Sequence, residues 1–246
     1  MPAGPLHRQA AAGFSRAAGE YERARPGYPP DAVAWLAQRL GLREGRTVVD
    51  LAAGTGKLTR LLVQSGARVI AVEPLPEMRA LIEPPAEAVD GTAEALPLEN
   101  ASADAVTVAQ AFHWFDFDAA LAEILRVLRP GGRLGLIWNR RSDADEVNLA
   151  IERLVEPHRG DTPSHRGAPW REAFDRSPFG PPEERGFDNP QRLDADGLAE
   201  RVASMSFIAA LPEADRARVV EAARELASGG PVTLGQRTDV AVYAAP

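Results

Sequence analysis

The chain has 246 residues, 45% of them hydrophobic, which is enough for one substantial core. It carries a formal charge of −7 at pH 7 and contains no cysteine. The acidic balance argues against a nucleic-acid partner, and the lack of cysteine excludes disulfides, thiolate nucleophiles and cysteine-based metal sites. We find neither an apolar run long enough to span a membrane nor a secretory signal, so we expect no membrane partner and a cytoplasmic location.

The first 40 residues are expected to form an N-terminal lid or helix segment. Asp31 is the predicted cap of a helix that ends near Leu40. From residue 41 to 140 short apolar strands alternate with amphipathic helices, which indicates right-handed βαβ units around a parallel sheet. The predicted strands are Thr47–Leu51, Arg68–Val72, a weaker one at Ala86–Val89, Ala105–Ala109 and Arg133–Trp138.

The helix before the strand at Arg133 has the clearest apolar stripe of the chain. Asp118 is its predicted cap, and Pro130-Gly131-Gly132 is expected to stop it. Residues 141–195 are predicted to be a loop-rich insertion, anchored to the core by three aromatic residues: Trp170, Phe174 and Phe179. Residues 196–246 are predicted to form C-terminal helices, broken near Pro212, and a last strand at Thr238–Ala244. We expect all of these parts to form a single domain.

The sharpest local signal is a turn of small residues, Ala52 to Gly56, between a predicted strand and a predicted helix. Such a turn lets a nucleotide-like ligand approach the backbone closely. Asp50 precedes the turn, and Glu73 ends the second strand, where a carboxylate can accept hydrogen bonds from both ribose hydroxyls. A phosphate-binding P-loop is excluded, because Leu51 occupies its first glycine position and Leu58 follows Lys57 where a hydroxyl is required.

The turn, Asp50-Leu51-Ala52-Ala53-Gly54-Thr55-Gly56, resembles the first motif of class I S-adenosylmethionine-dependent methyltransferases. Later segments that are similar to motifs of this family follow in order: Val72-Glu73-Pro74 with Met78, residues 91–97, residues 109–115 and residues 128–132. The segment from Tyr21 to Pro29 resembles the type 11 branch that includes trans-aconitate-type enzymes. The resemblance implies a Rossmann-like, doubly wound α/β fold with a mostly parallel seven-stranded sheet and an antiparallel last strand.

The resemblance also implies which residues bind S-adenosylmethionine and release S-adenosylhomocysteine. They are Asp50, Ala52, Ala53, Gly54, Thr55, Gly56, Glu73, Pro74, Met78, Thr92, Ala93, Glu94 and Gln110. The chain departs from the family pattern at two of these positions. Ala52 replaces the first glycine of the turn, and Thr92 replaces an aspartate before the adenine contact.

The implied reaction is an in-line methyl transfer to oxygen, nitrogen or carbon of a small-molecule acceptor, promoted by proximity and desolvation. It needs no metal. His113 is the candidate general base, with a loop histidine bonded to the backbone as the open alternative. The candidate acceptor pocket consists of Tyr21, Arg25, Tyr28, Phe112, Trp114 and Trp138, although the first three can equally form a packed helix and the aromatic residues can be core.

Two other functions stay open at this stage. An NAD-dependent oxidoreductase would use the same sheet, although Thr59 occupies the third glycine position of the dinucleotide fingerprint. A non-catalytic S-adenosylmethionine-binding protein would share every one of these motifs. The oligomeric state is expected to be a monomer or a homodimer.

Overall fold

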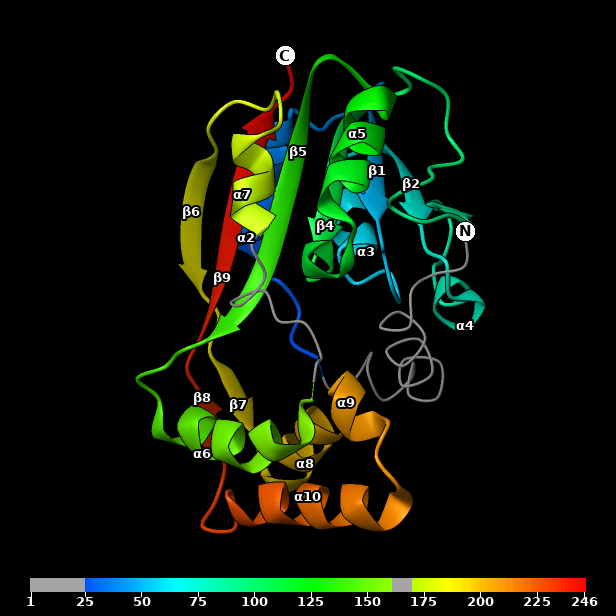
Figure 1. Cartoon of the computed structure of the whole chain (residues 1–246). Helices are drawn as coiled ribbons and strands as arrows, with labels where there is room; N and C mark the ends of the chain where they lie inside the picture. The colour runs from blue at the N-terminus through cyan, green and yellow to red at the C-terminus, as the bar shows by residue number, and fades with distance from the viewer. Residues whose placement is uncertain (1–24, 161–169) are drawn as a thin grey trace. The chain divides into compact units, whose positions relative to one another are not determined.

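A computed structural model describes residues 25–160 and 170–246 of the chain (Figure 1). Its contacts divide the chain into two compact units. Among the described residues, the sheet unit comprises 27–138, 170–187 and 238–246, and the helical unit comprises 25–26, 139–160 and 188–237. The described part of the chain contains no helix with the length and hydropathy of a membrane span.

Seven strands form the main sheet in the order β3-β2-β1-β4-β5-β9-β6. Their bounds are β1 Thr47–Leu51, β2 Arg68–Val72, β3 Glu87–Val89, β4 Ala103–Ala109, β5 Leu128–Arg141, β6 Glu183–Asp188 and β9 Gln236–Ala244. The strands from β3 to β5 pair in parallel, whereas β9 runs against its neighbours β5 and β6 (Figure 1). The predicted mostly parallel seven-stranded sheet is therefore confirmed.

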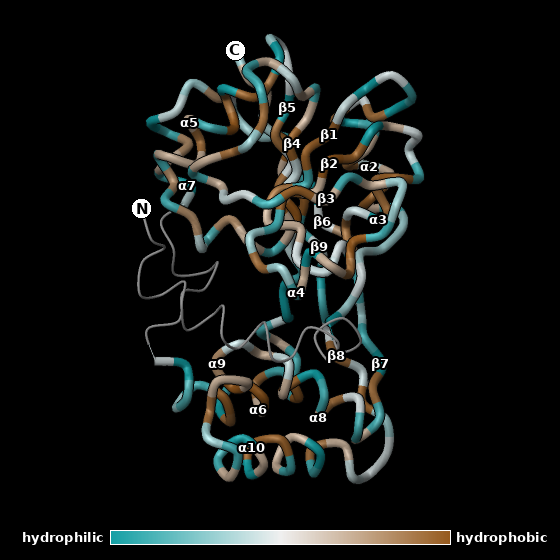
Figure 2. The backbone as a smooth tube through the Cα atoms, turned by 90° about the vertical axis from the view of Figure 1, so that its right-hand side faces the viewer, coloured by the Kyte–Doolittle hydropathy of each residue, from teal (hydrophilic) through white to brown (hydrophobic). Residues whose placement is uncertain are grey.

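Helices cover both faces of this sheet, as a doubly wound fold requires. Helices α2 (Pro30–Leu40) and α3 (Thr59–Val63) bury apolar residues against one face, and α5 (Phe117–Val127) and α7 (Trp170–Asp175) against the other. The inner strands are apolar almost throughout, which Figure 2 shows as brown tube along β1 and β4. Gly135 of β5 lets α2 pack closely on the sheet, because an added Cβ would lie 2.6 Å from Leu36 Cδ1 and would force that side chain to move.

The helix caps differ from those predicted. Asp31 lies in the first turn of α2, after Pro29, and its Oδ1 accepts a hydrogen bond from the amide of Ala32. Asp116, not Asp118, caps α5 by accepting from the amide of Ala119 at 3.2 Å. The backbone conformation decided both positions, since a cap must precede the first helical residue with extended backbone.

Helix α5 also ends earlier than predicted. It stops at Val127, and β5 begins at Leu128, so Pro130-Gly131-Gly132 lies within the span of the strand. The turn at Gly131, with a φ of 73°, falls beside the point where the pairing of β4 with β5 changes register.

Residues 141–195 contain α6 (Glu146–Val155), α7 and the strands β6 and β7 (Gln191–Leu193) besides loops. Strand β6 was hidden in the sequence, because it is an edge strand in which only Phe187 is buried. The predicted aromatic anchoring is confirmed. The ring of Phe174 stacks on Tyr243 at 3.9 Å, and the ring of Trp170 lies 4.8 Å from that of Trp138.

The helical unit packs α6, α8 (Ala195–Ala203), α9 (Ser206–Ala209) and α10 (Glu213–Glu225) around a small core of its own. A two-stranded antiparallel sheet of β7 and β8 (Val232–Leu234) completes it, together with the short 3-10 helix η2 (Glu156–His158). The predicted break at Pro212 is confirmed, since this residue directly precedes α10.

One guanidinium on α5 fastens the loop that precedes β4. The Nε and Nη2 of Arg126 donate to the two carboxylate oxygens of Glu123, both at 2.7 Å. The same group donates to the carbonyls of Leu96 and Leu98 and to Asn100 Oδ1, at 2.8 to 3.0 Å. Every N–H of Arg126 thus has an acceptor, and the loop cannot leave α5 without breaking several charge-assisted bonds.

We expect Arg126→Ala to lower the free energy of unfolding by about 2–3 kcal/mol, because it leaves Glu123 and two backbone carbonyls without their hydrogen-bond donor. Urea unfolding followed by circular dichroism measures this change. Arg176→Ala is the matched control, since Arg176 makes an exposed pair with Asp118 and should contribute less than about 0.5 kcal/mol. Equal losses of stability in the two variants would contradict the role of Arg126 in holding the loop before β4.

Candidate functional site

The turn between β1 and α3 has an unusual backbone. Ala52, Gly54 and Gly56 all adopt positive φ angles, of 53°, 58° and 81°. Glycine takes this conformation without strain, but in alanine the Cβ lies too close to the following carbonyl oxygen. The turn leaves the backbone of Ala52 to Gly54 partly exposed, at the carboxyl ends of the parallel strands where ligands bind in open α/β sheets.

Glu73 extends from the end of β2 toward this turn. Its Oε2 accepts the amide hydrogen of Gly54 at 2.8 Å, and its Oε1 accepts that of Leu75 at 2.9 Å. The structure therefore brings together Gly54 and Glu73, two predicted site residues that lie 19 positions apart. Burial raises the pKa of the Glu73 carboxyl, although the two amides and Arg79 oppose the effect. Each oxygen keeps a lone pair for another donor.

Asp50 is more deeply enclosed, with 1% of its surface exposed. Its Oδ2 accepts from the hydroxyl of Thr59 at 2.6 Å, and its Oδ1 from that of Thr107 at 2.8 Å. The carboxylate thus joins β1 to β4 and to the start of α3. Burial raises the pKa of Asp50 to about 6. The hydrogen bonds from the two hydroxyls lower this pKa, and repulsion from Glu73 raises it further.

The two hydroxyl partners of Asp50 were not predicted from the sequence. Thr107 lies in the middle of the otherwise apolar strand β4, where its hydroxyl needs a buried acceptor. That isolated hydroxyl was the available signal. Thr59 follows the turn, and from the sequence it was interpreted only as a residue that replaces the third glycine of the dinucleotide fingerprint.

The remaining predicted cofactor residues lie around the same edge. Met78 is buried, with its Sδ 3.9 Å from where a Cβ of Gly54 would be, whereas Pro74 is exposed. In the adenine segment Ala93 is buried, and Glu94 Oε1 accepts from the amide of Asp116. The others lie near them: Ala53 and Thr55 in the turn, Thr92 beside Ala93, and Gln110 at the end of β4.

Gln110 shares the strained backbone of the turn, with a φ of 60°. Its amide donates to the carbonyl of Ile137 on β5 at 3.0 Å. Ala52 and Gln110 are two of the three non-glycine residues with positive φ in the described chain, and they follow the neighbouring strands β1 and β4. Strained backbone of this kind gathers at functional sites.

The candidate acceptor residues are less well grouped. Phe112 is fully buried among the rings of Phe115, Phe117, Trp170 and Phe174, so the structure places it in the core. Trp138 is also buried and packs on Trp170. His113 and Trp114 are half-buried in the 3-10 helix η1 (Phe112–Trp114), with their rings 5.2 Å apart.

The early candidates fall in different parts of the chain. Tyr21 lies outside the described residues. Arg25 belongs to the helical unit, where its Nη2 donates to the carbonyl of Ser204 at 3.1 Å. Tyr28 belongs to the sheet unit and packs, partly buried, against the core on the α2 face.

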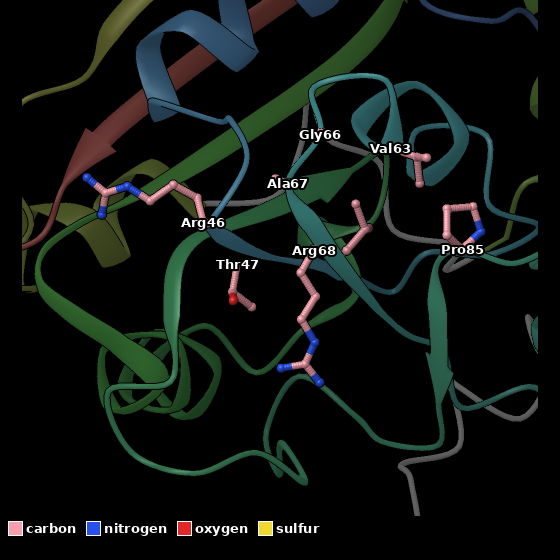
Figure 3. Close-up of a pocket in the computed structure, with 9 residues that line it drawn as sticks. Arg46, Thr47, Val63, Gly66, Ala67, Arg68 and Pro85 are labelled. Atoms are coloured by element: carbon pink, nitrogen blue, oxygen red, sulfur yellow. The ribbon is translucent and has the colours of Figure 1, made fainter.

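A hollow of about 450 Å³ lies at the opposite edge, by the starts of β1 and β2 (Figure 3). Its two cations are already paired. Arg46 donates to Asp104 at 2.5 Å and Arg68 to both oxygens of Glu87, and Figure 3 shows the two side chains turned apart. The two arginines of this hollow are therefore engaged with acids, and the candidate site is placed at the carboxyl edge on the contacts of Glu73 and Asp50. The described residues also contain no group of histidine, aspartate and glutamate that could hold a metal.

The chain is similar in sequence to known methyltransferases. A family model described as a methyltransferase domain matches residues 49–136. An uncharacterised methyltransferase of Mycobacterium tuberculosis H37Rv is 40% identical over 222 residues, which cover 89% of this chain and 86% of the relative. An uncharacterised methyltransferase-like protein of Schizosaccharomyces pombe is 36% identical over 210 residues, covering 84% and 82% of the two chains.

Solved structures agree with these relatives. A protein of Anaeromyxobacter dehalogenans, provisionally named a type II methyltransferase, matches with a TM-score of 0.67 and 25% identity over 90% of this chain and 97% of its own. A geranyl diphosphate methyltransferase solved in complex with SAM matches with a TM-score of 0.51 and 16% identity, over 88% and 85% of the chains. The second likeness concerns the fold alone.

We predict that Asp50→Asn changes how stability depends on pH. Because folding raises the pKa of Asp50 from 3.8 to about 6, the folded state favours the protonated form. The stability from this group is fully present below about pH 4 and is lost as the pH rises through about 6, a change of roughly 3 kcal/mol.

Denaturant unfolding between pH 4 and pH 7 tests this, with the difference between the native chain and Asp50→Asn as the readout. That difference should move in favour of the variant as the pH rises. Asp118→Asn, which removes an exposed carboxyl group, is the control. A difference that does not vary with pH would refute the assigned burial.

We further expect Ala52→Gly to stabilise the fold by about 0.5 kcal/mol. It relieves a left-handed conformation that costs an alanine roughly 1–2 kcal/mol, against about 0.5–1 kcal/mol for the extra freedom of glycine when unfolded. Ala53→Gly, one position along the same turn, should destabilise. Thermal unfolding of both variants measures the contrast, and a loss of stability in both would show that Ala52 is unstrained.

Proposed function

Because the chain belongs to the class I S-adenosylmethionine-dependent methyltransferases, we propose that it transfers the methyl group of S-adenosylmethionine to a small-molecule acceptor at the carboxyl edge of its sheet. The relatives support methyl transfer, since their similarity extends over most of both chains. The acceptor class is our own inference, from the acidic charge of the chain. No observation favours the oxidoreductase or the non-catalytic alternative.

The observation that carries this proposal is the contact between the Glu73 carboxylate and the amide of Gly54. It joins the end of β2 to the turn after β1. A carboxylate therefore lies beside a turn of small residues whose backbone a ligand can approach closely. The two amide bonds hold the carboxylate in one orientation. The remaining lone pairs of its two oxygens match the two hydroxyls of a ribose.

The other residues of this edge fit the rest of the cofactor. Met78 and the buried Ala93 provide apolar surface for an adenine ring, and the backbone next to Ala93 offers polar groups for its edge. Gln110, at the strained end of β4, can contact the cofactor from the neighbouring strand. Asp50 fits as an internal brace beneath the turn, since its enclosed carboxylate holds the hydroxyls of Thr59 and Thr107.

When bound, S-adenosylmethionine supplies a methyl group already activated by its sulfonium. The acceptor lone pair forms the new bond to the methyl carbon as the carbon–sulfur bond breaks, and S-adenosylhomocysteine is the product. The chain must therefore align the acceptor and exclude water. His113 is half-buried after β4, and we assign it as the base that takes the proton when the acceptor carries one.

We predict that Glu73→Ala weakens binding of S-adenosylhomocysteine by about 1–3 kcal/mol, because two ribose hydroxyls lose a charged acceptor. Isothermal calorimetry measures the affinity. Glu87→Ala is the matched control, as Glu87 is an exposed acid on the adjacent strand β3 and should leave binding unchanged.

Turnover gives a second readout. Incubation of the chain with S-adenosylmethionine and a small-molecule extract should release S-adenosylhomocysteine, and Glu73→Ala should suppress this release. A native chain that shows no binding heat and no thermal protection by S-adenosylhomocysteine would refute the function. Unchanged affinity in Glu73→Ala would refute the ribose role alone.

A further inference from the structure

Arg79 ends the short helix α4 (Pro76–Arg79), and its side chain turns back to the residue where β2 ends. Its Nη1 donates to the backbone carbonyl of Glu73 at 2.6 Å. The amide of Arg79 donates to the carbonyl of Leu75 at 2.9 Å, a hydrogen bond within the turn of α4 itself. The guanidinium therefore holds the backbone of the very residue that carries the candidate ribose acid.

The same Nη1 reaches Asp90 Oδ1 at 3.2 Å. Asp90 follows β3 and immediately precedes the segment of Gly91, Thr92 and Ala93. Its side chain is 72% exposed, so this ion pair contributes little stability by itself. It keeps the guanidinium over the ends of two neighbouring strands, β2 and β3.

The charge of Arg79 also acts on the Glu73 carboxylate. Burial raises the pKa of Glu73, the amides of Leu75 and Gly54 oppose this rise, and Arg79 is the cation that adds to their effect. The charge of Glu73 in turn raises the pKa of Asp50 on β1. The other charged residues of the surrounding elements are Glu77 on α4, Lys57 in the turn and Arg60 on α3, whose Nη1 donates to the carbonyl of Thr55 in that turn, besides Asp90.

We propose that Arg79 is a positioning residue for the cofactor, which acts through Glu73 by keeping its carboxylate charged and its backbone fixed. This inference rests on the proposed function, because it needs Glu73 to bind the ribose. A neutral Glu73 can accept fewer hydrogen bonds and presents a hydroxyl of its own. Arg79 thereby sets the lower limit of the pH range in which the cofactor binds.

The test compares S-adenosylhomocysteine affinity, by calorimetry between pH 5 and pH 8, in the full chain and in Arg79→Met. The native chain should lose affinity as the pH falls through the pKa of Glu73. Arg79→Met should bind about tenfold more weakly at pH 7, with the loss beginning at a higher pH than in the native chain. Arg79→Lys keeps the charge, and it should retain the native pH profile while losing part of the affinity.

The chain offers a matched control on the same pair of strands. Arg68 pairs with both oxygens of Glu87, at the amino ends of β2 and β3, so Arg68→Met removes a similar ion pair away from Glu73. It should leave both the affinity and the pH profile as in the native chain. In a Glu73→Gln background, Arg79→Met should no longer move the pH profile.

The outcomes separate the two proposals. If the native chain does not bind S-adenosylhomocysteine, the proposed function fails. If it binds, and Arg79→Met behaves like Arg68→Met, the role of Arg79 is overturned. Should Arg79→Met not fold, Arg79→Gln, which keeps a donor for the Glu73 carbonyl without the charge, takes its place and must give the same upward shift of the profile.

Discussion

Two buried carboxylates at neighbouring strand ends impose the main constraint on the sheet unit. A buried carboxylate must receive hydrogen bonds, because its desolvation is otherwise too costly. Glu73 receives the amides of Gly54 and Leu75, and Asp50 receives the hydroxyls of Thr59 and Thr107. These bonds join the turn, the start of α3 and three strands. The strained φ of Ala52 belongs to the same arrangement, since the turn must deliver the Gly54 amide to Glu73.

The two edges of the sheet treat their acids differently. At the amino edge Asp104 receives Arg46, Arg129 and the amide of Thr47. Burial opposes its ionisation, but these partners outweigh it and lower the pKa of Asp104. At the carboxyl edge burial prevails, and the pKa values of Asp50 and Glu73 are raised. The fully paired charge at the amino edge stabilises the fold. The incompletely compensated charge at the carboxyl edge leaves capacity for a ligand.

The sequence was most informative where chemistry is local. The small-residue turn, the acid at the end of β2 and the alternation of strands and helices could all be predicted, because each depends on neighbouring residues or a short repeat. Strand β6 could not, since an exposed edge strand carries no apolar pattern. The predicted caps of α2 and α5 were each two residues too late, because the cap is set by where the backbone changes from extended to helical.

The sequence by itself determined the family and the doubly wound sheet, and it nominated Asp50, Glu73 and the turn between them, since these follow from spacing along one strand–turn–helix unit. Only the tertiary structure decided what each acid contacts. It enclosed Asp50 between two threonines, placed Phe112 in the aromatic core, and brought Arg79 to the carbonyl of Glu73. These contacts arise from packing between elements distant in the chain or from a side chain folding back, and neither leaves a periodic trace in the order of the residues.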